Sequence, residues 1–183
     1  MPKIRAVFAL LSLSLATLII APGCTSSATS ASTGEYIDDS VVTTKVKTAY
    51  LNDKGTPGGA ISVETYKGTV NLSGFVDTAE QKAKAESLAA KVEGVKSVSN
   101  NIVVKTSKGT AGAFIDDSVI TTKVKSALVK TDGTPSAAIS VETFRGEVLL
   151  SGFVDTAAEK SKAQEVAEKI EGVKAVTNGV VVK

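Results

Sequence analysis

Residues 61–76 read ISVETYKGTVNLSGFV, and residues 139–154 read ISVETFRGEVLLSGFV. In each stretch apolar and polar residues alternate, a Lys-Gly or Arg-Gly pair interrupts them, and the alternation then resumes. Alternation with a period of two indicates half-buried strands, and a Gly-containing pair between two such runs indicates a tight turn. Both stretches are therefore predicted to be β-hairpins, with Val70 and Leu72 facing the core in the first.

The two hairpins belong to a tandem duplication. Residues 37–105 recur as residues 115–183 at a constant offset of 78 positions without a gap, and roughly two thirds of the positions are identical. A site formed within one copy should therefore occur twice, unless it depends on positions at which the copies differ. The predicted organisation is a signal peptide (1–23), a lipidated flexible tether (24–36), a first domain (37–105), a linker (106–114) and a second domain (115–183).

Each copy also carries two helical patterns. Val42, Val46 and Tyr50 recur with helical spacing before the first hairpin, and Thr78 and Gln81 have the spacing of a capping box after it. Gly94 is expected to end this second helix in a left-handed conformation. A last apolar run predicts a third strand, which gives an α+β fold of two αββαβ domains. Two helices should cover one face of each three-stranded sheet, and the other face must be polar or docked.

Composition excludes several kinds of chemistry. The chain has no His, and its one Cys is Cys24. Imidazole catalysis, zinc-finger sites and internal disulfides are therefore excluded, and neither a metal nor a cofactor is expected. Without Lys3 and Arg5, basic and acidic residues balance at 19 each. A chain without a dense basic stripe is not expected to bind nucleic acid.

Some carboxylates in and after the hairpins are repeated between the copies, and paired carboxylates can catalyse hydrolysis by acid–base chemistry. Their positions near strand ends and turns favour capping and solvation instead, so an enzyme is not expected. The residues are Glu64, Asp77, Glu142 and Asp155.

The N-terminus has the order of a secretory signal. Lys3 and Arg5 precede an uncharged run over residues 6–21, which is followed by Pro22, Gly23 and Cys24. A single transmembrane anchor is the alternative, although the run is short for a spanning helix. The small residue before Cys24 resembles a bacterial lipobox, which implies lipid attachment at Cys24 and an outer-membrane lipoprotein facing the periplasm. Ordinary cleavage nearby would instead release a soluble periplasmic protein.

The hairpins, the segment VEGVKSV (92–98) and the closing NNIVVK (100–105) resemble the BON domain, the bacterial osmotic-stress and nodulation domain. Gly68, Gly74 and Gly94, with their counterparts in the second copy, lie where this family has glycine. Tandem copies after a secretory signal are similar to dual-BON envelope proteins. The resemblance implies a non-enzymatic protein of envelope integrity whose partners are anionic phospholipid surfaces or envelope proteins. A soluble periplasmic osmotic-stress chaperone is the alternative.

The resemblance also points to the first helix of the second copy as a lipid-binding element. There Lys123 and Lys125 would meet anionic headgroups while Val119 and Ile120 touch acyl chains. An ordinary solvated helix face is the alternative.

The sharpest difference between the copies is Leu149, which stands where the first copy has Asn71. Because its neighbours in the strand face the core, Leu149 should face outward. Together with Phe144 it is predicted to form a patch on which the two domains dock.

Overall fold

The hairpin in each copy forms as the alternation predicts. The computed structural model describes residues 38–105, called here the first half, and 116–183, called the second half. The bounds in the first half are α1 (Asp39–Asn52), η1 (Gly58–Ala60), β1 (Ile61–Tyr66), β2 (Thr69–Val76), α2 (Ala79–Ala90) and β3 (Ser97–Val104). Those in the second half are α3 (Asp117–Lys130), η2 (Ser136–Ala138), β4 (Ile139–Phe144), β5 (Glu147–Val154), α4 (Ala157–Glu168) and β6 (Ala175–Val182).

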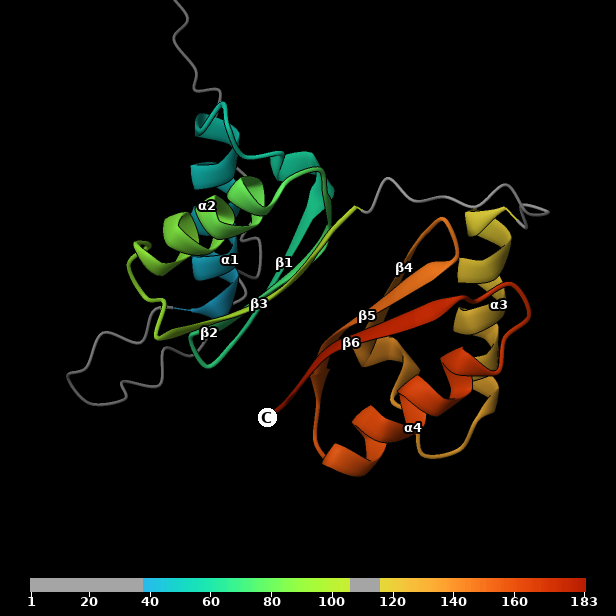
Figure 1. Ribbon diagram of the computed structural model, residues 1–183. Coiled ribbons are helices and arrows are strands. Elements are labelled where there is room, and N and C mark those ends of the chain that lie inside the picture. The colour runs from blue at the N-terminus through green and yellow to red at the C-terminus, as the bar shows by residue number, and fades with distance from the viewer. Residues whose placement is uncertain (1–37, 106–115) are drawn as a thin grey trace, which may run out of the picture. The chain divides into compact units, whose positions relative to one another are not determined.

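Each half contains a three-stranded sheet with the order β1-β2-β3 or β4-β5-β6 (Figure 1). The hairpin strands pair antiparallel, and the third strand pairs parallel to the central strand. Two helices lie on the same face of each sheet (Figure 1). This architecture confirms the predicted α+β fold of tandem αββαβ domains.

A two-residue turn closes the first hairpin, and the first helix holds that turn. Lys67 and Gly68 both have positive φ, at 50° and 82°, which is the geometry of the hairpin turn that matches strand twist. Their backbone N–H groups donate hydrogen bonds of 2.6 and 2.8 Å to the carboxylate of Asp39 at the start of α1. Asp117 accepts the same two bonds in the second half. The acidic residue after the N-cap therefore fixes the helix against the hairpin.

Gly74 marks a point where the first strand comes too close for a side chain. Its φ is +129°, and a Cβ at this position would overlap the carbonyl oxygen of Ala60. Gly152 has the same φ and the same close approach, to Ala138. Close packing against the preceding strand therefore requires glycine at this position in both halves.

The capping box at the second helix is confirmed, because the hydroxyl of Thr78 accepts a bond from the backbone of Gln81 and the Gln81 side chain accepts one in return. The expected position of Gly94 as the helix C-cap is wrong. The helix ends at Ala90, and Lys91 caps it in a right-handed conformation. Gly94 instead takes its positive φ of 94° in the turn that leads to β3.

The core of each half lies between its helices and its sheet. It is aliphatic except for Tyr50, whose buried hydroxyl donates a 2.9 Å hydrogen bond to the carbonyl of Ala85. Leu128 occupies the matching place in the second half. Among residues 38–105 and 116–183, no helix is long and apolar enough to cross a bilayer.

Candidate functional site

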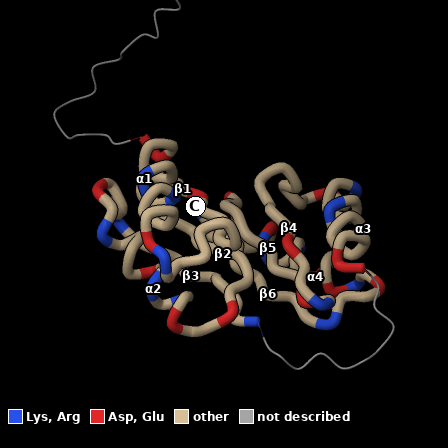
Figure 2. The backbone as a smooth tube through the Cα atoms, turned by 90° about the horizontal axis from the view of Figure 1, so that it is seen from above, with Lys and Arg blue, Asp and Glu red and all other residues tan. Residues whose placement is uncertain are grey.

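The first helix of the second half presents both apolar and basic residues at its surface. Val119 is 43% exposed and Val129 is 71% exposed, near the two ends of α3. Lys123, Lys125 and Lys130 are also exposed, and basic positions are coloured blue along this helix and along α1 (Figure 2). Lys123 forms a 3.1 Å ion pair with Glu171, in the turn between α4 and β6. Surface pairs of this kind contribute little stability, so Lys123 can exchange its partner at low cost.

Ile120 is placed differently from the sequence expectation. It is only 1% exposed and packs in the core of the second half. Because Ile120 faces the sheet, it cannot touch a membrane surface in this fold. Val119, its neighbour, is the residue of this pair that reaches solvent.

The same surface recurs on α1 with fewer charges. Val41 and Leu51 are exposed at the positions that match Val119 and Val129. Lys45 forms a 2.8 Å ion pair with Glu93, and the ammonium group holds the pKa of this carboxyl below its usual range. The last turn of α1 has no basic residue, whereas that of α3 has Lys130. The two helices therefore expose apolar residues at matching positions, but α3 carries more positive charge.

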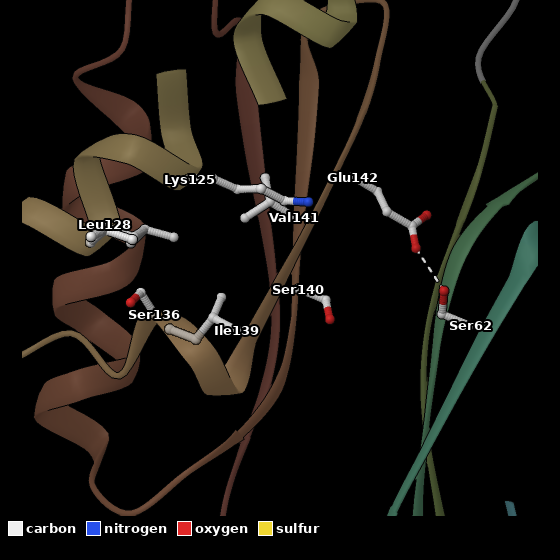
Figure 3. A pocket seen from close by; sticks show the side chains of 9 residues that line it. Ser62, Lys125, Leu128, Ser136, Ile139, Ser140, Val141 and Glu142 are labelled. Carbon is white, nitrogen blue, oxygen red and sulfur yellow. Dashed lines mark hydrogen bonds between the residues drawn. The ribbon is translucent and has the colours of Figure 1, made fainter. Parts of the chain in front are cut away.

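A groove of about 470 Å³ lies beside α3 (Figure 3). Lys125 reaches over one part of it, and the carboxylate of Glu142 points to Ser62 of the first half, which donates a 2.7 Å hydrogen bond. The groove therefore combines apolar residues with hydroxyl groups, one ammonium and one carboxylate. Its lining residues are Ser62, Lys125, Leu128, Val129, Ser136, Ile139, Ser140, Val141 and Glu142.

The sheet faces that the helices leave uncovered are also buried. Both halves belong to a single compact unit, and β2 contacts both β5 and β6. The hydroxyls of Ser73 and Ser151 form a 3.0 Å hydrogen bond between the central strands. Ser140 donates a 2.9 Å hydrogen bond to Glu64, which mirrors the bond from Ser62. Polar residues that read as solvent-facing in the sequence thus lie between the two sheets.

Aromatic rings and lysines surround these hydrogen bonds. The ring of Phe144 lies 5.5 Å from that of Phe75, and the ring of Tyr66 lies 5.6 Å from that of Phe153. The ammonium of Lys183 lies 5.3 Å from the centre of the Tyr66 ring. Its hydrogen bond to Asp155 raises the pKa of Lys183, so this cation stays charged throughout the neutral range. The tilted rings and cations are arranged as aromatic and cation–π pairs require.

Leu149 is only 1% exposed, on the sheet face opposite the helices. Its neighbours in the sheet are Glu142 on β4 and Thr177 on β6. Phe144 lies against Phe75, as described above. The structure therefore places both residues of the predicted patch near the other half. Cys24 lies outside the described residues.

Sequence reasoning missed the polar residues of the contact, among them two asparagines and a glycine. Asn71 and Asn101 each donate a 3.1 Å side-chain hydrogen bond to the backbone carbonyl of Gly179. Their role depends on partners that are 78 and 108 positions away, so local periodicity carries no signal for it. The only available sign was that both positions differ between the copies, at Asn71 against Leu149 and Asn101 against Gly179.

The repeated carboxylates are all engaged in structural contacts. Glu64 and Glu142 accept hydrogen bonds from serines of the opposite half. Asp77 pairs with Lys105 at 3.0 Å, and Asp155 pairs with Lys183 at 3.0 Å. Within residues 38–105 and 116–183, no group of three or more His, Cys, Asp or Glu side chains is placed to hold a metal.

The fold defines a tandem pair of small αββαβ modules, each with two helices and a three-stranded sheet. A model of the BON domain matches residues 38–106 and 116–183. The chain therefore belongs to the BON domain family, of which it carries two copies.

The chain is also similar to osmotically-inducible protein Y of Escherichia coli (strain K12), with 43% identity over 70 residues. This alignment covers 38% of the chain and 35% of the relative, so it spans about a third of the relative's length. The similarity supports an OsmY-like tandem BON protein.

Two solved structures give weaker similarity. One is CdsD, a structural protein of the type III secretion system of Chlamydia trachomatis, at 22% identity and a TM-score of 0.33. The match covers 80% of this chain and 64% of the CdsD chain. The C-terminal domain of CdsD gives the same identity and TM-score and is covered over 68% of its length.

Proposed function

We propose that this protein is a non-enzymatic component of the bacterial cell envelope that binds anionic phospholipid surfaces through α3 and acts under osmotic stress. The observation that carries the proposal is the position of the exposed apolar side chains. Val119 and Val129 stay exposed near the ends of α3, and lysines lie between and beside them. Interfacial helices bind membranes by this combination of apolar contact and attraction to anionic lipid.

The charge of α3 favours it over α1. Each lysine near an anionic bilayer surface contributes about 1 kcal/mol, so Lys123, Lys125 and Lys130 together contribute about 3 kcal/mol. Attraction of this size corresponds to weak binding by itself. A lipid chain on Cys24 would supply the second anchor that stable membrane attachment needs. The basic helix then orients a protein that the lipid already holds at the membrane.

The test is sedimentation of the Cys24→Ser chain with vesicles of phosphatidylglycerol or of phosphatidylcholine. Binding to the anionic vesicles is expected, and Lys123→Glu/Lys125→Glu/Lys130→Glu should abolish it. The matched control is Lys45→Glu/Lys47→Glu on α1, which should retain most of the binding. Equal binding to both lipids, or equal loss in both variants, would contradict the proposed role of α3.

Lipid attachment has its own test. Metabolic labelling with palmitate should mark the natural chain and leave Cys24→Ser unlabelled. An unlabelled natural chain would place the protein among soluble periplasmic proteins.

The groove beside α3 favours a second candidate, a soluble osmotic-stress chaperone. Among its lining residues Val129 is exposed, and the hydroxyl groups of Ser136 and Ser140 also line the groove, which suits an apolar side chain of an unfolded client. The Cys24→Ser chain should then suppress aggregation of a reduced client protein without any lipid, and Val129→Asp should weaken this effect. A chain that leaves client aggregation unchanged would remove this candidate.

A further inference from the structure

The contact between the two halves has the pattern of a symmetric dimer. In a twofold contact, residue i of one partner meets residue j of the other, and j also meets i. The bonds Ser62–Glu142 and Ser140–Glu64 obey this rule, because each residue of one bond is the counterpart of a residue in the other. The ring pairs Tyr66–Phe153 and Phe75–Phe144 obey it as well.

Ser73 and Ser151 are counterparts of each other and are hydrogen-bonded. A residue that meets its own counterpart lies at the twofold axis, so this pair marks the centre of the contact. Asn101 and Gly179 are also counterparts that meet across the contact. Two identical halves would therefore have to place the same side chains against each other at this centre.

Symmetry is broken at this centre. A Cβ at position 179 would lie 2.6 Å from the Cβ of Asn101, a distance that two real side chains cannot share. The missing side chain leaves room for Asn101, whose Nδ2 donates to the carbonyl of Gly179 at 3.1 Å and to Oδ1 of Asn71 at 2.8 Å. Asn71 in turn donates its own 3.1 Å bond to the same carbonyl. The first half thus supplies the amides, and the second half supplies the space and the acceptor.

We propose that Asn71 and Asn101 in the first half, with Leu149 and Gly179 in the second, make sheet docking selective for unlike halves. The partner that fits each uncovered sheet face is the other kind of half, in the same chain or in a second copy of the chain. Neither half docks on its own kind.

Pairing of two first halves fails on steric grounds. The contact would set Asn101 against a second Asn101, at the spacing that now requires Gly179. Backbone separation would have to increase, and the hydrogen bond at the Ser73 position would be lost.

Pairing of two second halves fails for a different reason. Gly179 would face Gly179, which leaves a gap where the Asn101 side chain now lies. Leu149 would replace Asn71 and has no donor for the carbonyl of Gly179. A buried acceptor without a donor is costly, as is an unfilled gap. Specificity of this kind combines attraction to the right partner with penalties on the wrong ones.

The test exchanges these four residues in the full chain with Cys24→Ser. Ser73→Cys/Ser151→Cys reports docking, because the two hydroxyls lie 3.0 Å apart and cysteines there should form a disulfide under mild oxidation. Leu149→Asn/Gly179→Asn gives the second half the residues of the first and should slow disulfide formation about tenfold or more. Adding Asn71→Leu/Asn101→Gly restores an unlike pair with the roles exchanged, and cross-linking should return to within about threefold of the starting rate.

Each residue type that is introduced already occupies the matching position in the other half, so both halves are expected to keep their fold. Far-UV circular dichroism checks this expectation. If Leu149→Asn/Gly179→Asn loses its helical signal, Asn71→Leu/Asn101→Gly replaces it, because this variant also makes the two halves alike, with the residues of the second half in both. A disulfide within one chain joins unlike halves, and a non-reducing gel separates it from disulfides between two chains, which count as unlike pairing only when they join position 73 to position 151. Unchanged cross-linking in a folded double variant, or a folded fourfold variant as slow as the double, would overturn the proposal.

Discussion

Leu149 and Leu150 are adjacent in β5 but lie on opposite faces of the sheet, and this allows docking of the halves to be tested in solution. Leu150 packs in the core beneath the helices, whereas Leu149 lies on the uncovered face. Leu→Ala removes three carbon atoms, which is worth about 2.5 kcal/mol in transfer free energy. The cavity left behind brings the usual loss to about 2–5 kcal/mol. If the halves stay docked, both substitutions should therefore lower the free energy of unfolding by this amount.

The assay is equilibrium unfolding in urea. With a slope of about 2 kcal/mol per molar urea, each variant should shift the midpoint by roughly 1–2.5 M. Val119→Ala on exposed α3 is the surface control and should change stability by less than about 0.5 kcal/mol. A Leu149→Ala variant that behaves like this control, while Leu150→Ala shows its full loss, would mean that the sheet face is open in solution. The reasoning about docking would then be refuted.

Three further predictions concern the halves themselves. Gly152→Ala should lower the free energy of unfolding by about 1–3 kcal/mol because of its positive φ alone, and the new Cβ would also clash with Ala138. The control is Gly59→Ala, whose Cβ would meet no atom within 4 Å and which should leave the thermal unfolding transition nearly unchanged. Thr156→Ala removes the cap of α4 and should cost about 1 kcal/mol by urea unfolding. Burial raises the pKa of Tyr50 above its usual range. Below about pH 10 the tyrosine is neutral in both states, and its burial contributes fully to the free energy of unfolding. Above this pH the tyrosine ionises in the unfolded chain before it ionises in the folded core, so this contribution is lost. The natural chain should lose more stability than Tyr50→Phe between about pH 9 and 11, and equal losses would contradict this assignment.

Most of the local structure could be predicted because the responsible interactions are close in sequence. The hairpin turn at Lys67-Gly68 and the capping box at Thr78 each involve neighbouring residues, and both are present. The exception at Gly94 is also instructive. Glycine signals a positive φ, but the chain uses that conformation to enter β3, and the helix has already ended at Ala90.

The surface of α3 was predicted less completely. Lys123, Lys125 and Val119 are exposed as expected, but Ile120 lies in the core. Adjacent residues on a helix point about 100° apart, so Val119 and Ile120 cannot share one narrow face. The helical spacing already placed Val42, and therefore its counterpart Ile120, on the apolar stripe that faces the sheet. The lipid-binding assignment of Ile120 was wrong because it conflicted with that stripe.

The sequence by itself determined that the chain repeats one αββαβ unit, where each strand and helix lies, and which residues face the helices. These follow from periodicity and capping, which act over a few residues. Only the tertiary structure decided what lies against the opposite sheet face, where the polar residues Asn71 and Ser73 are buried although their alternation reads as solvent-facing. A period of two distinguishes the two faces of a sheet but does not say what covers the second. Here the cover comes from the other copy, whose hydrogen-bonding partners lie 76 to 108 positions away, and a contact at that distance leaves no mark on the local pattern.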